Sequence, residues 1–320
     1  MHLVRYAQPD DMSVRIGVLD GEIVRPVEVA SMGALLSLSL ASIRDRLKQT
    51  GDDRPVGEVV LLAPVDGQME VWAAGVTYAR SRLARMEESQ QSDIYDLIYG
   101  ADRPELFFKS APWRVMTHGQ PIAIRGDSLL NVPEAELAVV ANAFGEIIGY
   151  LVCDDVSSRS IEAENPLYLP QAKIYAGSCA LSSGVRPAWE VDGTDLVISI
   201  EVLRGSEVVW ADATSTSQLR RRPAELVDFL YREQSFPQGV VLSTGTGLVP
   251  QIEFTLVAGD IVSIAIAGVG NLRSHVLVGQ EFRQAQSSEW PAGADRSRSA
   301  ASPHRPIMKT QSDSDPEIPR

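Results

Sequence analysis

Two glutamates separated by a single residue, Glu134 and Glu136, open an apolar run of the chain. Alternate side chains of a β-strand share a face, so both carboxylates would point the same way, about 7 Å apart along the backbone. The residues that follow are apolar on both faces, which indicates a strand buried on both sides. Like charges at the mouth of a buried strand need a cation or a proton between them. We therefore favour a metal site over the commoner solvent-exposed carboxylate pair.

A second apolar run, residues 147–153, follows a turn and ends in Asp154 and Asp155. Two adjacent strands can bring a third carboxylate to the same end of the sheet. Three oxygen ligands suit a hard cation, Mg²⁺, Mn²⁺ or Ca²⁺, with coordination positions left for water or substrate.

Two further charged residues lie where they could act on a bound substrate. Lys173 ends an irregular, Pro-containing loop after Asp155, where it is either an ordinary strand-end charge or a group that binds a carboxylate or acts as a base. Glu105 begins a strand with two phenylalanines and would need a partner if buried. Residues 77–104 form a long charged excursion, interpreted as either a lid or a surface helix.

Composition excludes several classes of function. The chain has 320 residues, a formal net charge of −13 and 44% hydrophobic residues. A strongly acidic chain lacks the basic footprint needed for nucleic acid or an anionic membrane. Neither a signal segment nor an apolar stretch of about 18 residues is present, and both cysteines lie in apolar runs. We expect a cytoplasmic protein.

The patterning predicts an α+β protein with three parts. Short strands over residues 2–7, 13–19 and 21–27 and a helix over 35–49 predict a small N-terminal α/β domain, residues 1–66. A strand-rich catalytic domain is expected over residues 67–283. Residues 284–320 lack periodicity and are expected to be a disordered tail.

With these residues assembled, the chain resembles the fumarylacetoacetate hydrolase superfamily over roughly residues 71–279. The motifs that carry the resemblance are Glu134-Ala135-Glu136, the segment Asp155 to Arg159, Lys173, and Thr244-Gly245-Thr246. Longer stretches, above all EAENPLYLPQAKIYAG at 162–177, resemble the branch that dehydrates 2-keto-3-deoxypentonates. Ser81 stands where many hydrolase relatives carry a histidine that activates water.

The resemblance implies a mixed β-roll and a homodimer or homotetramer that acts on a small 2-keto acid. It places Mg²⁺ or Mn²⁺ on Glu134, Glu136 and Asp155, with Lys173 or Glu105 as base. It also implies substrate contacts from Gly245, Thr246, Tyr78 and Arg82.

The expected reaction is metal-dependent dehydration of 2-keto-3-deoxy-D-pentonate to 2,5-dioxopentanoate. The alternatives are an acylpyruvase-type C–C bond hydrolase and a non-catalytic scaffold stabilised by metal.

Overall fold

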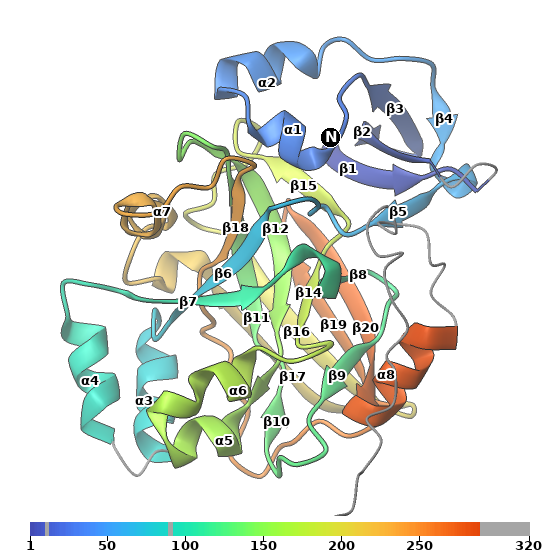
Figure 1. Ribbon diagram of the computed structural model, residues 1–320. Helices are drawn as coiled ribbons and strands as arrows, with labels where there is room; N and C mark the ends of the chain where they lie inside the picture. The colour runs from blue at the N-terminus through green and yellow to red at the C-terminus, as the bar shows by residue number, and fades with distance from the viewer. Residues whose placement is uncertain (10–12, 89–91, 289–320) are drawn as a thin grey trace, which may run out of the picture. The chain divides into compact units, whose positions relative to one another are not determined.

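The central strands of the fold are buried on both faces (Figure 1). The structure is a computed structural model and describes residues 1–9, 13–88 and 92–288. The side chains at 88, 92–95 and 285–288 are outside this description. The N-terminal elements are β1 (His2–Ala7), β2 (Val14–Asp20), β3 (Ile23–Val27), α1 (Met32–Leu36), α2 (Leu40–Arg46), β4 (Arg54–Pro55) and β5 (Val60–Leu62).

The middle of the chain contains the strands that end at the predicted site. Its elements are β6 (Glu70–Gly75), α3 (Ala79–Glu88), α4 (Ser92–Gly100), β7 (Glu105–Ser110), β8 (Met116–Thr117), β9 (Ile122–Ile124), β10 (Asn131–Val132), β11 (Ala135–Ala141), β12 (Ile147–Asp155), β13 (Ser157–Ser158), α5 (Arg159–Glu164) and α6 (Leu169–Lys173). The last elements are β14 (Cys179–Leu181), β15 (Gly184–Pro187), β16 (Val197–Arg204), β17 (Glu207–Ser215), α7 (Pro223–Tyr231), β18 (Val240–Ser243), β19 (Ile261–Ile266), β20 (Gly270–Val278) and α8 (Gly279–Ser288).

The main sheet is mixed. Its strands run in the order β4-β3-β2-β1-β15-β12-β11-β18-β6-β7, with β18 parallel to β6 and β11 antiparallel to both of its neighbours. A second sheet has the order β17-β16-β19-β20-β9. This combination of mixed sheets and short helices confirms the predicted α+β class.

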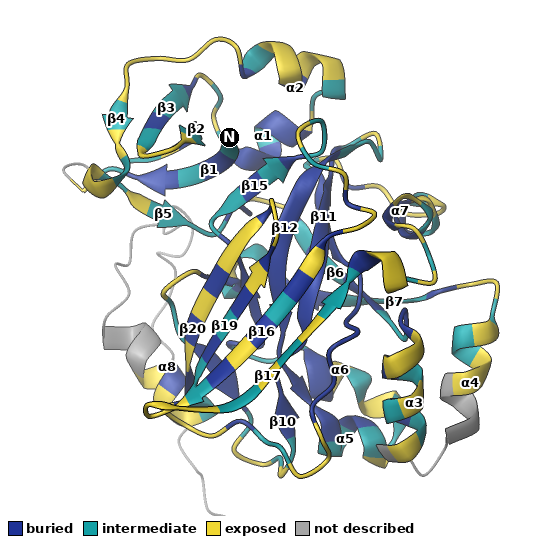
Figure 2. Cartoon of the chain, turned by 180° about the vertical axis from the view of Figure 1, so that it is seen from behind, coloured by how far each residue is buried: buried dark blue, intermediate teal, exposed yellow. Residues whose placement is uncertain are grey.

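Strand β11 is buried on both faces, as its sequence predicts. Leu137 and Val139 pack in one apolar cluster with Ile198 and Ile264 of the second sheet, whereas Ala138 lies in another cluster that includes residues of α1. Figure 2 shows β11 and β12 as uniformly buried, in contrast to the alternating exposure along β16, β19 and β20. The ends of β11 and β12 are thereby enclosed by protein on both sides.

Two sequence expectations about helices are wrong. The helix expected over 35–49 is two helices, because the hydroxyl of Ser39 accepts a hydrogen bond from Ser42 N–H and starts α2 anew. The loop expected before Lys173 contains α5 and α6, and the excursion over residues 77–104, interpreted as a lid or a surface helix, contains α3 and α4. The proline inside α6, Pro170, lies in the first turn of that helix, where proline is tolerated.

The N-terminal strands continue the main sheet through the β1–β15 pair. The predicted boundary at residues 66–67 falls between β5 and β6 and stays a prediction. Helix α8 extends to Ser288, past the expected start of the tail, and residues 289–320 lie outside the described residues. Among the described helices, none is long and apolar enough to cross a membrane.

Candidate active site

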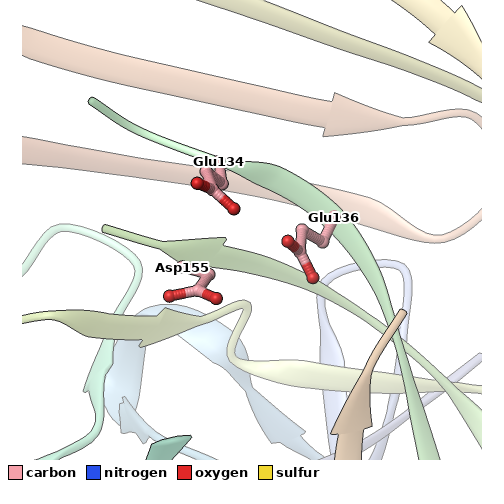
Figure 3. A group of neighbouring side chains, drawn as sticks. All are labelled: Glu134, Glu136 and Asp155. Atoms are coloured by element: carbon pink, nitrogen blue, oxygen red, sulfur yellow. The ribbon is translucent and has the colours of Figure 1, made fainter. Parts of the chain in front are cut away.

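Three carboxylates meet where β11 begins and β12 ends. Glu136 is paired with Cys153 across the two strands, so Asp155 lies beside Glu134, and Asp155 N–H donates to the Glu134 carbonyl at 3.0 Å. One oxygen from each of Glu134, Glu136 and Asp155 lies within 4.8 Å of the other two (Figure 3). All three side chains are buried. The structure thus brings together the three residues that the sequence indicated as ligands.

The donor set fits a hard divalent cation. Burial, followed by the neighbouring Asp155 and Glu134 carboxylates, raises the pKa of Glu136 well above its usual range. One Glu136 oxygen accepts hydrogen bonds from the Ser243 hydroxyl at 2.5 Å and from Gly245 N–H at 2.8 Å, which fixes the carboxyl group. Three buried oxygen donors that repel one another form a site in which a divalent cation favours the ionised state.

Lys173 is already paired with two of these carboxylates. Its Nζ donates to Glu134 Oε2 at 3.0 Å, Asp155 Oδ2 at 3.2 Å and Ser157 Oγ at 2.6 Å. Burial alone would lower the pKa of Lys173, but the Asp155 and Glu134 carboxylates outweigh burial and raise it. Lys173 is therefore held as a cation.

Two arginines hold the other oxygen of Glu134. Arg85 Nη2 lies 2.9 Å and Arg159 Nε 3.2 Å from Glu134 Oε1. Burial would raise the pKa of Glu134, but Lys173, Arg85 and Arg159 outweigh it and hold that pKa below its usual range. Glu134 is thus an anion before any metal binds.

Glu105 enters the same small pocket from the start of β7. Its carboxylate lies against the Cα of Gly75, where an added Cβ would come within 2.1 Å of Oε2. Burial, followed by repulsion from Glu162, raises the pKa of Glu105 to about 7. A carboxyl group with this pKa can accept or donate a proton near neutral pH. The positive charges of Arg85 and Lys173 act against this shift but do not cancel it.

The backbone beside Gly75 is strained. Val76 has φ of 51°, the sole non-glycine residue with positive φ in the described part of the chain. A β-branched residue is disfavoured there, and such outliers gather at functional sites. Val76 lines the pocket together with Gly75 and Glu105.

Gly245 and Thr246 of the turn at 244–246 also line the pocket. Gly245 has φ of 90°, and a Cβ there would meet Thr77 Oγ1 at 2.0 Å, so only glycine fits. The Thr246 hydroxyl donates to the Ala135 carbonyl at 2.9 Å. The turn expected to contact the substrate therefore already holds Glu136 and the start of β11.

Two other residues expected to contact substrate lie away from the pocket lining. Tyr78 is buried, and its ring packs close to Gly247. Arg82 pairs with Asp96 of α4 at 3.2 Å. From helix α3 it is Ser81 and Arg85 that line the pocket.

The sequence interpretation missed three residues of the site. Lys109 is buried and forms an ion pair with Asp155, and Arg85 and Glu162 pair above Glu134. Lys109 gave one usable signal, a lysine directly after the two phenylalanines of β7. Nothing in the sequence separates Arg85 from the other arginines of α3.

Comparisons with known proteins agree with this geometry. The family model described as "Fumarylacetoacetate (FAA) hydrolase C-terminal" matches residues 70–277. A probable 2-keto-3-deoxyxylonate dehydratase of Haloferax volcanii is 49% identical over 214 residues, which cover 67% of this chain and 73% of that protein. The 2-dehydro-3-deoxy-D-arabinonate dehydratase of Saccharolobus solfataricus is 40% identical over 222 residues, covering 68% and 74%.

Solved structures give the same relationship. A 2-keto-3-deoxy-D-arabinonate dehydratase in its apo form matches with a TM-score of 0.76 and 33% identity, covering 87% of this chain and 99% of that one. A complex of that dehydratase with magnesium and 2,5-dioxopentanoate matches with a TM-score of 0.75, at the same identity and coverage. Since the family model spans more than half of the sequence, the chain belongs to the fumarylacetoacetate hydrolase family.

Proposed function

We propose that this protein is a metal-dependent hydro-lyase that converts a 2-keto-3-deoxypentonate to 2,5-dioxopentanoate. The observation that carries the proposal is Glu105, a carboxyl group with a pKa of about 7 that shares one pocket with the triad of Glu134, Glu136 and Asp155. The named dehydratases and the complex of such an enzyme with magnesium and 2,5-dioxopentanoate support it.

Glu134, Glu136 and Asp155 would hold Mg²⁺ or Mn²⁺. A cation at this position supplies a Lewis acid that acidifies the protons beside the substrate's keto group. Lys173 stays protonated and keeps Glu134 and Asp155 in place, which supports Glu105 rather than Lys173 as the base. An ammonium group whose hydrogens already bind three oxygens has no lone pair to accept a proton.

Glu105 takes a proton from C3, and the C3–H electrons form the C3–C4 double bond as the C4–O bond breaks. The same carboxyl group, now protonated, gives its proton to the departing hydroxide, so that water leaves. The unsaturated keto acid then loses one proton from C5 and the proton of the C5 hydroxyl group, and gains one proton at C3 and one at C4, to become the aldehyde. Gly245 and Thr246 form the wall against which the substrate's carboxylate binds, and Tyr78 and Arg82 contribute by holding the excursion closed.

The acylpyruvase alternative requires a base that delivers water to a carbonyl carbon. Ser81 cannot fill that role, because its hydroxyl donates to the Tyr78 carbonyl at 2.9 Å at the start of α3. No histidine lines the pocket among the described residues. A non-catalytic scaffold is disfavoured, since it gives no reason for a pocket that Glu105 shares with the three carboxylates.

Steady-state kinetics with Mg²⁺ separates these functions. We expect turnover of 2-keto-3-deoxy-D-pentonate. The product, 2,5-dioxopentanoate, is measured by coupling its formation to an aldehyde dehydrogenase. Acetylpyruvate should be cleaved far more slowly. A kcat/KM for acetylpyruvate above that for dehydration would establish the hydrolase, and no turnover of either would favour the scaffold.

We also propose the wider organisation that the sequence suggested. Residues 1–66 would form a small N-terminal α/β domain joined to the catalytic domain at residues 67–283, within a mixed β-roll. The protein would act in the cytoplasm as a homodimer or homotetramer, with partners limited to its small 2-keto acid and its metal. The acidic net charge, −13, supports the exclusion of nucleic acid and membrane.

A further inference from the structure

Helix α3 presents a polar face to the rest of the protein. Among its described side chains, at positions 79–87, the buried ones are Ser81 and Arg85, four residues apart and therefore on one face of the helix. Leu83 is 51% exposed. Docking of α3 therefore depends on the polar contacts of Arg85 far more than on apolar burial.

Arg85 reaches from α3 to two carboxylates. Its Nη2 lies 2.9 Å from Glu134 Oε1 and its Nη1 lies 2.5 Å from Glu162 Oε2, with 9% of the side chain exposed. Glu134 belongs to the triad, and Glu162 belongs to α5. A single guanidinium group thus connects the excursion between β6 and β7 to a candidate metal ligand.

The other three cations of the site are fixed to the body of the protein. Lys109 lies in β7 and donates to the carbonyls of Val156 and Lys173 at 3.1 and 2.6 Å. Arg159 begins α5, where its N–H donates to the Leu130 carbonyl at 2.8 Å. Lys173 ends α6. Only Arg85 among these four is carried by α3, beside α4 in Figure 1.

We propose that Arg85 and a divalent cation compete for Glu134, so that docking of α3 and metal binding oppose each other. A unit positive charge beside Glu134 repels an incoming dication at short range, in a buried setting where screening is weak. Because such coupling is reciprocal, a bound dication must weaken the docking of α3 by the factor by which Arg85 weakens metal binding. The metal-loaded protein is then the form in which α3 is docked less firmly.

This inference rests on the proposed metal site but not on the proposed reaction. Its test is calorimetric titration of metal-free protein with Mn²⁺ alone, comparing the wild type with Arg85→Gln. Removing the competing charge should tighten Mn²⁺ binding, on the order of tenfold. A purely structural role for Arg85 predicts the opposite, since loss of an ion pair that shapes the site would weaken binding.

Arg80→Gln is the matched control. Arg80 lies on the same helix and carries the same charge, but it pairs with Asp212 at 3.2 Å and its side chain is 58% exposed. Such exposed pairs contribute little. Its removal should leave the Mn²⁺ affinity close to that of the wild type.

Hydrogen exchange over residues 79–87 gives a second readout. Mn²⁺ should speed exchange there in the wild type, whereas in Arg85→Gln exchange should be fast with or without Mn²⁺. Equal or weaker Mn²⁺ binding by Arg85→Gln would overturn the competition and leave the metal site standing. Absence of Mn²⁺ binding by the wild type would overturn the metal site and the competition together.

Discussion

Replacing Glu105 by glutamine should separate its catalytic role from its effect on stability. The side chain keeps its size and its place against Gly75 but can no longer exchange a proton. If Glu105 is the base at C3, kcat/KM should fall by roughly 10²–10⁴-fold, the range typical of general acid–base catalysis.

The stability effect has a predictable sign. Burial and Glu162 raise the pKa of Glu105 from 4.5 to about 7, which corresponds to about 3 kcal/mol against the ionised form. The folded protein therefore retains a proton that the unfolded chain releases between about pH 4.5 and 7. The contribution of this group to the free energy of unfolding is present at low pH and lost as pH rises through 7. Glu105→Gln should match the wild type near pH 4 and exceed its unfolding free energy by up to about 3 kcal/mol at pH 8.

Two measurements check these expectations. Urea unfolding in the presence of a chelator, at pH 4 and pH 8, gives the difference in unfolding free energy. With Mg²⁺ bound, kcat/KM of the wild type should fall on the acidic side of a pKa at or below 7, because a bound dication lowers the pKa of a neighbouring carboxyl group. Glu207→Gln, an exposed change at the β16–β17 turn, should alter neither. Activity of Glu105→Gln above a tenth of the wild type would refute its assignment as the base.

Three further substitutions test the structure. Glu136→Gln removes a ligand charge while preserving volume, so metal-dependent turnover should vanish with little change in melting temperature; wild-type turnover in Mg²⁺ would contradict the triad. Gly75→Ala places a Cβ 2.1 Å from the Glu105 carboxylate, so kcat should fall about tenfold while the fold persists, as circular dichroism would verify; unchanged kcat would show that Glu105 need not stay there. Phe282→Ala empties a fully buried site beside Gly177 and should cost about 3–5 kcal/mol in denaturant unfolding, whereas a loss under about 1 kcal/mol would show that α8 does not dock.

Local patterning in the sequence predicted the centre of the fold. An apolar run that forms a strand buried on both faces, such as β11, can be recognised from its own sequence whatever surrounds it. That the side chains of Glu134 and Glu136 point to the same face follows from strand geometry. Asp155 could be assigned to the same end because β12 follows β11 through a short turn. The family motifs added the choice of Asp155 over Asp154.

The parts that failed depend on contacts distant in sequence. The split between α1 and α2 rests on one serine hydroxyl, and short polar helices such as α5 lack the periodicity that identifies longer ones. The sequence does not show whether Arg82 or Arg85 reaches the site, because that depends on which face of α3 meets Glu134. The pKa of Glu105 likewise depends on its neighbours from other elements.

Dehydration itself is tested most directly by identifying the product formed in deuterated water. Protein loaded with Mg²⁺ and given 2-keto-3-deoxy-D-pentonate should yield 2,5-dioxopentanoate with deuterium at C3 and C4, seen by proton and carbon nuclear magnetic resonance. Since the C4–O bond breaks and both carbons are reprotonated from solvent, an aldehyde signal should grow as the C4 carbinol signal disappears. Recovery of unchanged keto acid with deuterium at C3 alone, or of fragments from C–C cleavage, would contradict the account.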